Sequence, residues 1–409
     1  MKNLVPKRRF EEFKDSDPWE QRKLGELAQY RRGSFPQPYG KEEWYNGDGA
    51  MPFVQVVDVT DSLALAENTK QKISRIAQPK SIFVPKGKVI VTLQGSIGRI
   101  AITQYDCFVD RTLLIFESYN RAIDVVFWAY TMQMKFDIEK EKAPGGTIKT
   151  ITKEALTDFV ISLPKYKEQQ RIGTFLSNLD HLITLHQRKL DKLKETKSAY
   201  LSEMFPKEGE FYPKRRFAGF TDPWEQCKLG ETINYIVDNR GKNPSYYCDK
   251  GIPVIDNYMI KNNCYPNLNE ASRFIDDEIY ENFIRKYNEF DDTLITLVGN
   301  GIGNVTMFPK TKSVIIQNTL GLRFNENKKF MFYLMLFKNK DILLLNRGMA
   351  QPNIRQDELL DIDIKLPALD EQNKISDFFF KLDNLITLHQ RKLDKLQALK
   401  QAYLSEMFI

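Results

Sequence analysis

Apolar residues recur at spacings of three and four along two long stretches of the chain. The first stretch contains Ile172, Phe175, Leu179 and Leu182, then His186, Leu190 and Leu193. The second contains Ile375, Phe378, Leu382 and Leu385, then His389, Leu393 and Leu396. This spacing is typical of an amphipathic helix. On the two sides of each histidine the spacing is four residues, and two consecutive spacings of four resemble a stutter in a heptad pattern. Pro164 and Pro367 suit helix starts. Two helices of about 40 residues, each about 60 Å long, are predicted.

The two helical stretches are copies of one another. The twelve residues LITLHQRKLDKL begin at Leu182 and return unchanged at Leu385, and the match extends outward at a constant offset of 385 − 182 = 203 residues. A second repeat begins with PKRRF at Pro6 and Pro213. The chain therefore reads as an arm, a globular unit and a long helix, followed by the same three parts again. Such self-similarity indicates a tandem duplication.

The globular units between the helices have diverged further. Each contains an apolar strand that ends in glycines, VIVTLQGSIG from Val89 and TLITLVGNGIG from Thr293, and each closes on a related tail from Gly145 and Gly348. Short apolar runs bounded by turn residues favour strand-dominated α/β units. The predicted fold is of the α+β class. The predicted domains are 1–164 (arm and first unit), 165–205 (central helix), 206–367 (arm and second unit) and 368–409 (C-terminal helix).

The two helices are expected to pack against each other, because their apolar stripes otherwise lack a partner. We predict an antiparallel coiled coil in which four leucines of one helix meet four of the other: Leu179, Leu182, Leu190 and Leu193 with Leu382, Leu385, Leu393 and Leu396. His186 and His389 are interpreted as packed or register-setting residues whose layers lie on either side of the dyad. The charges of HQRKLDK favour a solvated helix face over a nucleic-acid contact.

Composition adds outer bounds. The chain has 60 Lys and Arg against 54 Asp and Glu, a net charge of +6 that suits a nucleic-acid binder without requiring one. Four cysteines form no C-x-x-C pair, which disfavours a disulfide or metal site and favours a reduced, cytoplasmic chain. The N-terminal residues do not resemble a signal peptide, and no apolar run is long enough to span a membrane.

Three stretches imitate catalytic motifs, and the repeat tests each. Asn243-Pro244-Ser245-Tyr246 resembles the signature of adenine methyltransferases, but its counterpart is Phe35-Pro36-Gln37-Pro38, so a turn is favoured. The glycines from Gly299 could cradle a nucleotide, but a tight turn explains them better. Asp361-Ile362-Asp363-Ile364-Lys365 ends like a nuclease motif, yet ordinary strand alternation accounts for it. The sequence argues against catalysis and predicts no metal site.

Two variable units alternating with two nearly identical long helices, with G-x-I-G after a strand and a tail running into Leu-Pro, resemble the specificity subunit of type I restriction-modification systems. The resemblance covers essentially the whole chain. It implies that the units are target-recognition domains, that the helices separate them and dock two modification subunits, and that the double-stranded DNA target is bipartite. S-adenosylmethionine and ATP would then belong to the modification subunits and the restriction (motor) subunits, and this chain would hold no cofactor. The first copy departs from the family's tail pattern at Gly146–Thr150.

Physical reasoning supports this arrangement, because two related reading heads fit opposite strand directions best with internal pseudo-twofold symmetry. Base reading needs side chains with paired donors and acceptors. The loops that differ between the copies carry such groups, and the predicted DNA-binding residues are Arg31, Arg32, Lys149, Arg240, Lys242, Asn243, Gln351, Asn353 and Arg355. The arm repeat further predicts that the two chain termini are neighbours. The alternatives are a duplicated scaffold that binds only proteins and an enzyme that uses the glycine turn.

Overall fold

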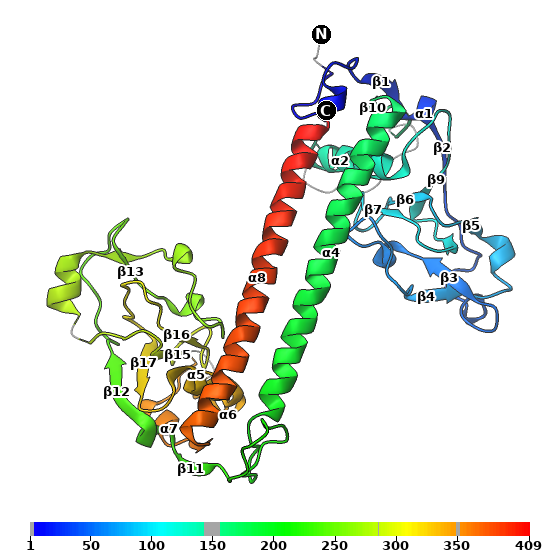
Figure 1. The fold of residues 1–409 in the computed structure, drawn as a ribbon. Coiled ribbons are helices and arrows are strands. Elements are labelled where there is room, and N and C mark those ends of the chain that lie inside the picture. The colour runs from blue at the N-terminus through cyan, green and yellow to red at the C-terminus, as the bar shows by residue number, and fades with distance from the viewer. Residues whose placement is uncertain (1–3, 143–155, 285, 349–351) are drawn as a thin grey trace. The chain divides into compact units, whose positions relative to one another are not determined.

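The computed structural model describes residues 4–142, 156–284, 286–348 and 352–409. The chain forms two compact units (Figure 1). Unit 1 comprises residues 1–185 and 393–409, and unit 2 comprises residues 186–392. Each unit therefore contains one globular head and a part of both long helices. The long helices are α4 (Tyr166–Glu203, 38 residues) and α8 (Leu369–Met407, 39 residues). Their extents confirm the predicted lengths.

The head of unit 1, called head 1 below, is built on short strands. Its strands are β1 (Glu20–Lys23), β2 (Ala28–Arg32), β3 (Met51–Val54), β4 (Gln71–Ile73), β5 (Ile82–Val84), β6 (Val89–Thr92), β7 (Ile100–Ile102), β8 (Cys107–Val109), β9 (Leu113–Tyr119) and β10 (Val160–Leu163). Its helices are the single turn α1 (Leu24–Leu27) and α2 (Val125–Lys142). Two four-stranded sheets have the orders β2-β9-β6-β7 and β4-β3-β8-β5, and β1 pairs with β10. The main core lies between the first sheet, α2 and the helix ends that belong to this unit.

The head of unit 2, head 2, follows the same plan with fewer strands. Its strands are β11 (Glu225–Lys228), β12 (Ile233–Asp238), β13 (Ile252–Pro253), β14 (Phe274–Ile275), β15 (Thr293–Thr296), β16 (Val305–Met307), β17 (Thr319–Phe324) and β18 (Asp363–Leu366). Its helices are α5 (Lys328–Phe337), α6 (Asn339–Leu344) and α7 (Gln356–Leu360). One sheet has the order β12-β17-β15-β16, β13 pairs with β14, and β11 pairs with β18. The predicted mixed α+β class is confirmed in both heads.

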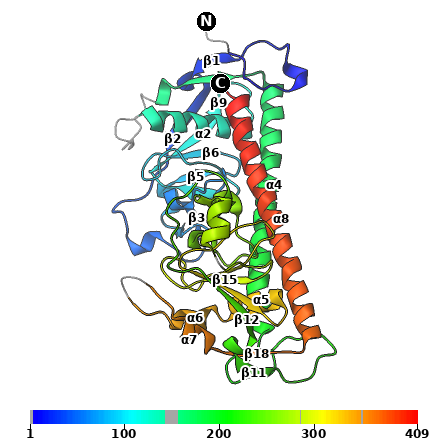
Figure 2. The ribbon, with the colours of Figure 1, turned by 90° about the vertical axis from the view of Figure 1, so that its left-hand side faces the viewer.

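The long helices run antiparallel in each unit. In unit 1, the rings of Phe175 and Tyr403 are 4.7 Å apart. In unit 2, the rings of Tyr200 and Phe378 are 5.0 Å apart, and Lys197 pairs with Asp383 at 2.7 Å. Residues early in α4 thus meet residues late in α8, and the reverse holds in the other unit. The predicted antiparallel pairing is confirmed (Figure 2).

The apolar seam of the helices differs from the predicted one at two positions. Leu182 and Leu385 are 41% and 46% exposed, whereas Leu179 and Leu382 are buried. Ile183 and its counterpart Ile386, which are half-buried, occupy the seam positions in their place. From Ile172 to Met204 the seam then keeps an uninterrupted 4-3 alternation, so the stutter proposed from the sequence is wrong. Leu190 and Leu393 are buried, and Leu193 and Leu396 are partly buried, as a seam position requires.

The two seam histidines form one layer, not two. The Nδ1 atoms of His186 and His389 lie 2.9 Å apart, and their rings are 5.1 Å apart. The prediction of separate layers on either side of the dyad is therefore wrong. Burial, followed by the charges of His186, Lys189 and Lys392, lowers the pKa of His389. The neutral form of His389 is thus favoured, and a neutral imidazole can donate or accept the Nδ1–Nδ1 hydrogen bond.

Each arm packs against the end of one long helix. In unit 1, the backbone N–H of Arg8 donates to the carbonyl of Glu406 at 2.8 Å, and Trp19 contacts Phe408. In unit 2, Arg215 makes the same backbone bond to Glu203. The first described residues of the chain thus lie beside its C-terminus, and the predicted proximity of the termini is confirmed.

Each arm also binds the start of the other long helix through a buried ion pair. Arg9 donates two hydrogen bonds of 2.7 Å to Glu168, and Arg216 donates bonds of 2.8 and 2.7 Å to Glu371. The glutamate side chains are 2% and 1% exposed. A bidentate arginine–carboxylate pair fixes orientation as well as distance. This set of contacts, called the joint below, explains why PKRRF and the helix starts are repeated.

Candidate nucleic-acid interface

The glycine-rich stretches are turns between antiparallel strands. Gly95 and Gly98 join β6 to β7, and Gly299, Gly301 and Gly303 join β15 to β16. All five glycines have positive φ, between 67° and 84°, a region that residues with a Cβ rarely adopt. A dinucleotide cradle requires a strand that leads into a helix. The interpretation of these stretches as tight turns is confirmed.

In head 1, two of the predicted contact residues lie at the end of β2. Arg31 and Arg32 are both exposed, and the Arg31 guanidinium lies 3.6 Å from Glu117. An exposed pair of this kind is weak and leaves the arginine free to turn toward a phosphate. Lys149 lies outside the described residues.

In head 2, Arg240 is bound within its own head. Its guanidinium donates to both carboxylate oxygens of Asp238 at 2.9 and 2.7 Å and to Gln356 at 2.6 Å. The pairing with Arg240 lowers the pKa of Asp238. With these donors in use, Arg240 positions the loop rather than presenting a fork to a base. Lys242 donates to the carbonyl of Phe283 at 3.3 Å, and the exposed Asn243 accepts a hydrogen bond from Gln317.

Two further predicted residues lie beside the glycine turn of head 2. The backbone of Asn353 pairs with Arg347, and its side chain is exposed. Arg355 precedes α7 and donates to Asp357 at 3.0 Å, with 56% of its side chain exposed. Gln351 lies outside the described residues. The structure thus brings Asn353 and Arg355 to one edge of head 2, while Arg240 joins them only through Gln356, the first residue of α7.

The other motif-like stretches have structural roles. Tyr246, in the methyltransferase-like tetrapeptide, donates to Asp276 at 2.7 Å, and this bond raises the pKa of Tyr246 to about 12. In the nuclease-like stretch, the carboxylates of Asp361 and Asp363 both lie within 3.4 Å of the Lys228 ammonium group. Ile364, which separates Asp363 from Lys365, is buried. Strand alternation in β18 therefore accounts for this stretch, as predicted.

Sequence reasoning missed a cleft in head 1. A cavity of about 640 Å³ is lined by Tyr39, Tyr45, Gln55, Gln71 and Asp110, among others. Burial, and then the charge of Asp110, raise the pKa of Tyr39, so its phenol stays protonated. No motif marks this cleft, because its residues come from four separate segments. The only sequence signal was the difference between the two copies.

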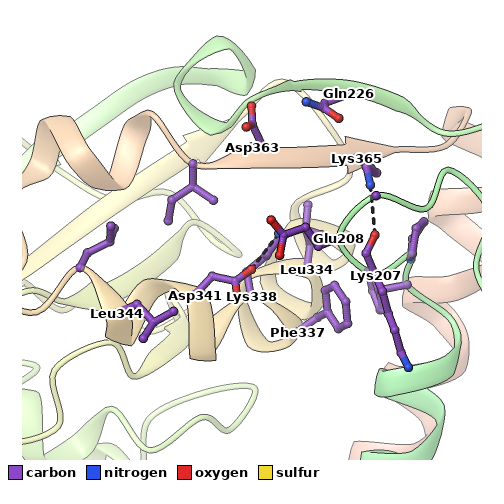
Figure 3. A pocket seen from close by; sticks show the side chains of 15 residues that line it. Lys207, Glu208, Gln226, Leu334, Phe337, Lys338, Asp341, Leu344, Asp363 and Lys365 are labelled. Carbon is purple, nitrogen blue, oxygen red and sulfur yellow. Dashed lines mark hydrogen bonds and ion pairs between the residues drawn. The ribbon is translucent and has the colours of Figure 1, made fainter.

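Head 2 carries one cavity beside the segment that follows α4 and another along α8. The cavity in Figure 3, about 490 Å³, is lined by residues 205–209 and by parts of α5, α6 and β18. At its wall Lys365 donates to the Lys207 carbonyl at 3.1 Å, and Lys338 pairs with Asp341 at 2.8 Å. A larger groove of about 940 Å³ lies between residues 263–269 and α8. The first cavity is part of the arm packing and contains none of the predicted contact residues.

Among residues 4–142, 156–284, 286–348 and 352–409, no three His, Cys, Asp or Glu side chains gather as a metal ion would require. Within the same ranges no helix is long and apolar enough to cross a bilayer.

The duplicated plan agrees with one protein family. A sequence model described as the type I restriction modification DNA specificity domain matches residues 16–195 and 221–398, once in each half of the chain. The chain belongs to this family. It is a specificity subunit with two target-recognition domains.

Individual relatives show the same extent of similarity. The type I restriction enzyme MjaVIII specificity subunit of Methanocaldococcus jannaschii is 24% identical over 401 residues, covering 94% of this chain and 91% of the relative. The putative MjaX specificity subunit of the same organism is 23% identical with equal coverage. In structure, the type I restriction-modification S subunit from M. genitalium matches with a TM-score of 0.67 at 16% identity, over 99% of both chains. This specificity subunit thus shares the fold of that subunit along its whole length.

Proposed function

We propose that each head of this specificity subunit reads one half of a bipartite double-stranded DNA target, and that the helix pair sets the spacing between the halves. The observation that carries the proposal is the contrast within each unit. The joint is repeated residue for residue, whereas the heads differ in strands, loops and polar groups. Matching supports with different heads suit two readers that must recognise different sequences from equivalent positions.

The family suggests the class of partner. This chain matches, with a TM-score of 0.52 and 16% identity, a solved structure that is described as the basis of complex assembly in the type I restriction-modification system. We propose that this subunit joins two modification subunits along its helices, together with restriction subunits. Leu182 and Leu385, identical in the two copies and exposed, would contribute to that docking. In this proposal the chain is not itself an enzyme, and S-adenosylmethionine and ATP are held by the partner subunits.

The decisive experiment is selection of DNA by the assembled complex. The chain and its modification subunits are incubated with random-sequence duplexes, and the retained DNA is sequenced. We expect two short conserved blocks separated by a fixed number of unselected base pairs. Binding should weaken steeply with salt, because phosphate contacts release counterions. Retention without any enriched sequence would instead support a protein-binding scaffold, and methyl transfer by the isolated chain would contradict the non-catalytic role.

A further inference from the structure

The cleft of head 1 contains two buried hydrogen-bond acceptors without partners. Asp110 is 2% exposed, and its Oδ2 has no hydrogen-bond partner; the Oε1 atom of Gln71, which lines the same cleft, also has none. The other carboxylate oxygen, Oδ1, accepts from the backbone N–H and the hydroxyl of Thr112 at 3.0 and 2.6 Å. Buried acceptors are almost always satisfied in folded proteins, so these two atoms call for a donor beyond the Thr112 contacts. The Tyr39 hydroxyl, which accepts from Gln55 at 3.2 Å, faces Asp110, and the open cleft leaves room for a further donor from a bound molecule.

The equivalent place in head 2 has different chemistry. Gln55 and Asp256 each precede a short 3-10 helix after β3 and β13, so they correspond. Gln71 lies opposite Phe53, and Arg273 lies opposite Val254, the residue that corresponds to Phe53. In head 2 these groups satisfy one another, because Arg273 donates to Asp256 and to Tyr247 at 3.1 Å.

The strand register also shows which residue replaces Asp110. The N–H of Leu93 donates to the carbonyl of Thr112, and the N–H of Leu297 donates to that of Asn318. Thr112 and Asn318 therefore correspond, and two residues earlier Asp110 corresponds to Ile316, which is fully buried. The carboxylate is thus specific to head 1. A group needed by the fold itself would be expected in both heads.

We propose that the cleft of head 1 determines specificity by accepting hydrogen bonds from the exocyclic amino group of an adenine or cytosine of the target, through Asp110 and Gln71. This inference rests on the proposed reading of DNA by the heads. In the major groove the base-edge donors are adenine N6 and cytosine N4, whereas guanine and thymine present acceptors there. A carboxylate cannot donate, so it rejects a guanine O6 or thymine O4 at that position. The Tyr39 and Tyr45 rings supply flat apolar walls beside the acceptors.

The substitution Asp110→Asn tests the assignment with little structural disturbance. The asparagine carbonyl can still accept from Thr112, while the unpartnered oxygen becomes an amino donor. The full complex with modification subunits is offered a random duplex library, and the retained sequences are compared with those of the wild type. We expect the wild type to prefer an amino-bearing base at one position of one half-site. In Asp110→Asn this preference should fall by about tenfold or more, or reverse toward guanine or thymine.

Controls separate this inference from the proposed function. Asp61→Asn makes the same chemical change in head 1 at an exposed side chain that pairs with Arg99, and it should leave the motif unchanged. Gln71→Leu removes the second acceptor and should relax the same position, which keeps the test informative if Asp110→Asn does not fold. An unchanged motif in folded Asp110→Asn and Gln71→Leu, or changes in both half-sites, would overturn the inference alone. A wild type that selects no bipartite sequence would overturn the proposed function.

Discussion

The joint and the region of the head 1 cleft show opposite relations between the two copies. At the joint, Arg9 with Glu168 and Arg216 with Glu371 have nearly the same bond lengths and similar burial. At the cleft, Asp110 is replaced by Ile316, and Gln71 is replaced by Arg273. The joint must hold either head in the same orientation on nearly identical helices, so the same arginine–glutamate pair is kept in both units. In the proposed function the cleft faces a target that differs between half-sites, so its polar groups are free to diverge.

The largest effect should come from breaking the joint. Arg9→Ala leaves the Glu168 carboxylate buried without its partner and should lower the free energy of unfolding by about 3–5 kcal/mol. Arg216→Ala should cost a similar amount in unit 2. Urea denaturation measures both. Arg8→Ala, which removes an exposed pair with Glu406, should have a much smaller effect, because water screens an exposed ion pair. Very unequal effects of Arg9→Ala and Arg216→Ala would show that the two joints are not equivalent.

The next effect distinguishes the observed seam from the predicted one. Leu190→Ala should destabilise the chain by about 2–5 kcal/mol, because the side chain is 1% exposed. Leu182→Ala should change the stability of the isolated chain by about 0.5 kcal/mol or less. If docking of modification subunits uses this surface, Leu182→Ala should weaken their binding in a titration instead. Equal destabilisation by the two substitutions would restore Leu182 to the seam.

A smaller effect should be confined to one half-site. Arg355 is exposed at the edge of head 2 and is free to exchange its Asp357 partner for DNA. Arg355→Ala should relax one position of the second half-site by about 1–3 kcal/mol, read from the selected sequences, and leave the first half-site unchanged. Gln351→Ala is expected to act in the same way. Changes in the bases chosen at both half-sites would mean that the heads do not read independently.

The smallest effect should be a pH dependence from the histidine layer. The pKa of His389 is lowered in the folded chain, so the unfolded chain binds the proton first as the pH falls. This contribution to stability is complete above the ordinary histidine pKa of about 6.5 and is lost as the pH falls toward the lower folded value. Melting temperatures between neutral and mildly acidic pH measure it. His389→Leu should reduce the decline, whereas His181→Leu, at an exposed position, should not. An identical decline in both variants would remove the layer from the explanation.

Much of the architecture was available from the sequence because a duplication compares the chain with itself. The offset of 203 residues marked both long helices, and their ends at Glu203 and Met407 lie within two residues of the predicted ones. The repeated PKRRF predicted the neighbouring termini. Turn glycines were also predictable, since positive φ leaves little choice of residue. Strict local rules govern these features, so they can be derived without coordinates.

Tertiary structure decided which of several adjacent apolar residues is buried. Leu182 and Ile183 are neighbouring apolar residues, and a helical period alone cannot choose between them. In the structure Ile183 is half-buried, whereas Leu182 is 41% exposed. The histidine layer was misplaced for the same reason, since one shifted seam position changes the register of the whole pair. The cleft of head 1 was hidden because Tyr39, Gln55, Gln71 and Asp110 are far apart in sequence and meet only through the pairing of β3 with β4 and β8. Sequence patterns report periodicity and repetition, whereas a site assembled from separate segments exists only once the sheets have formed.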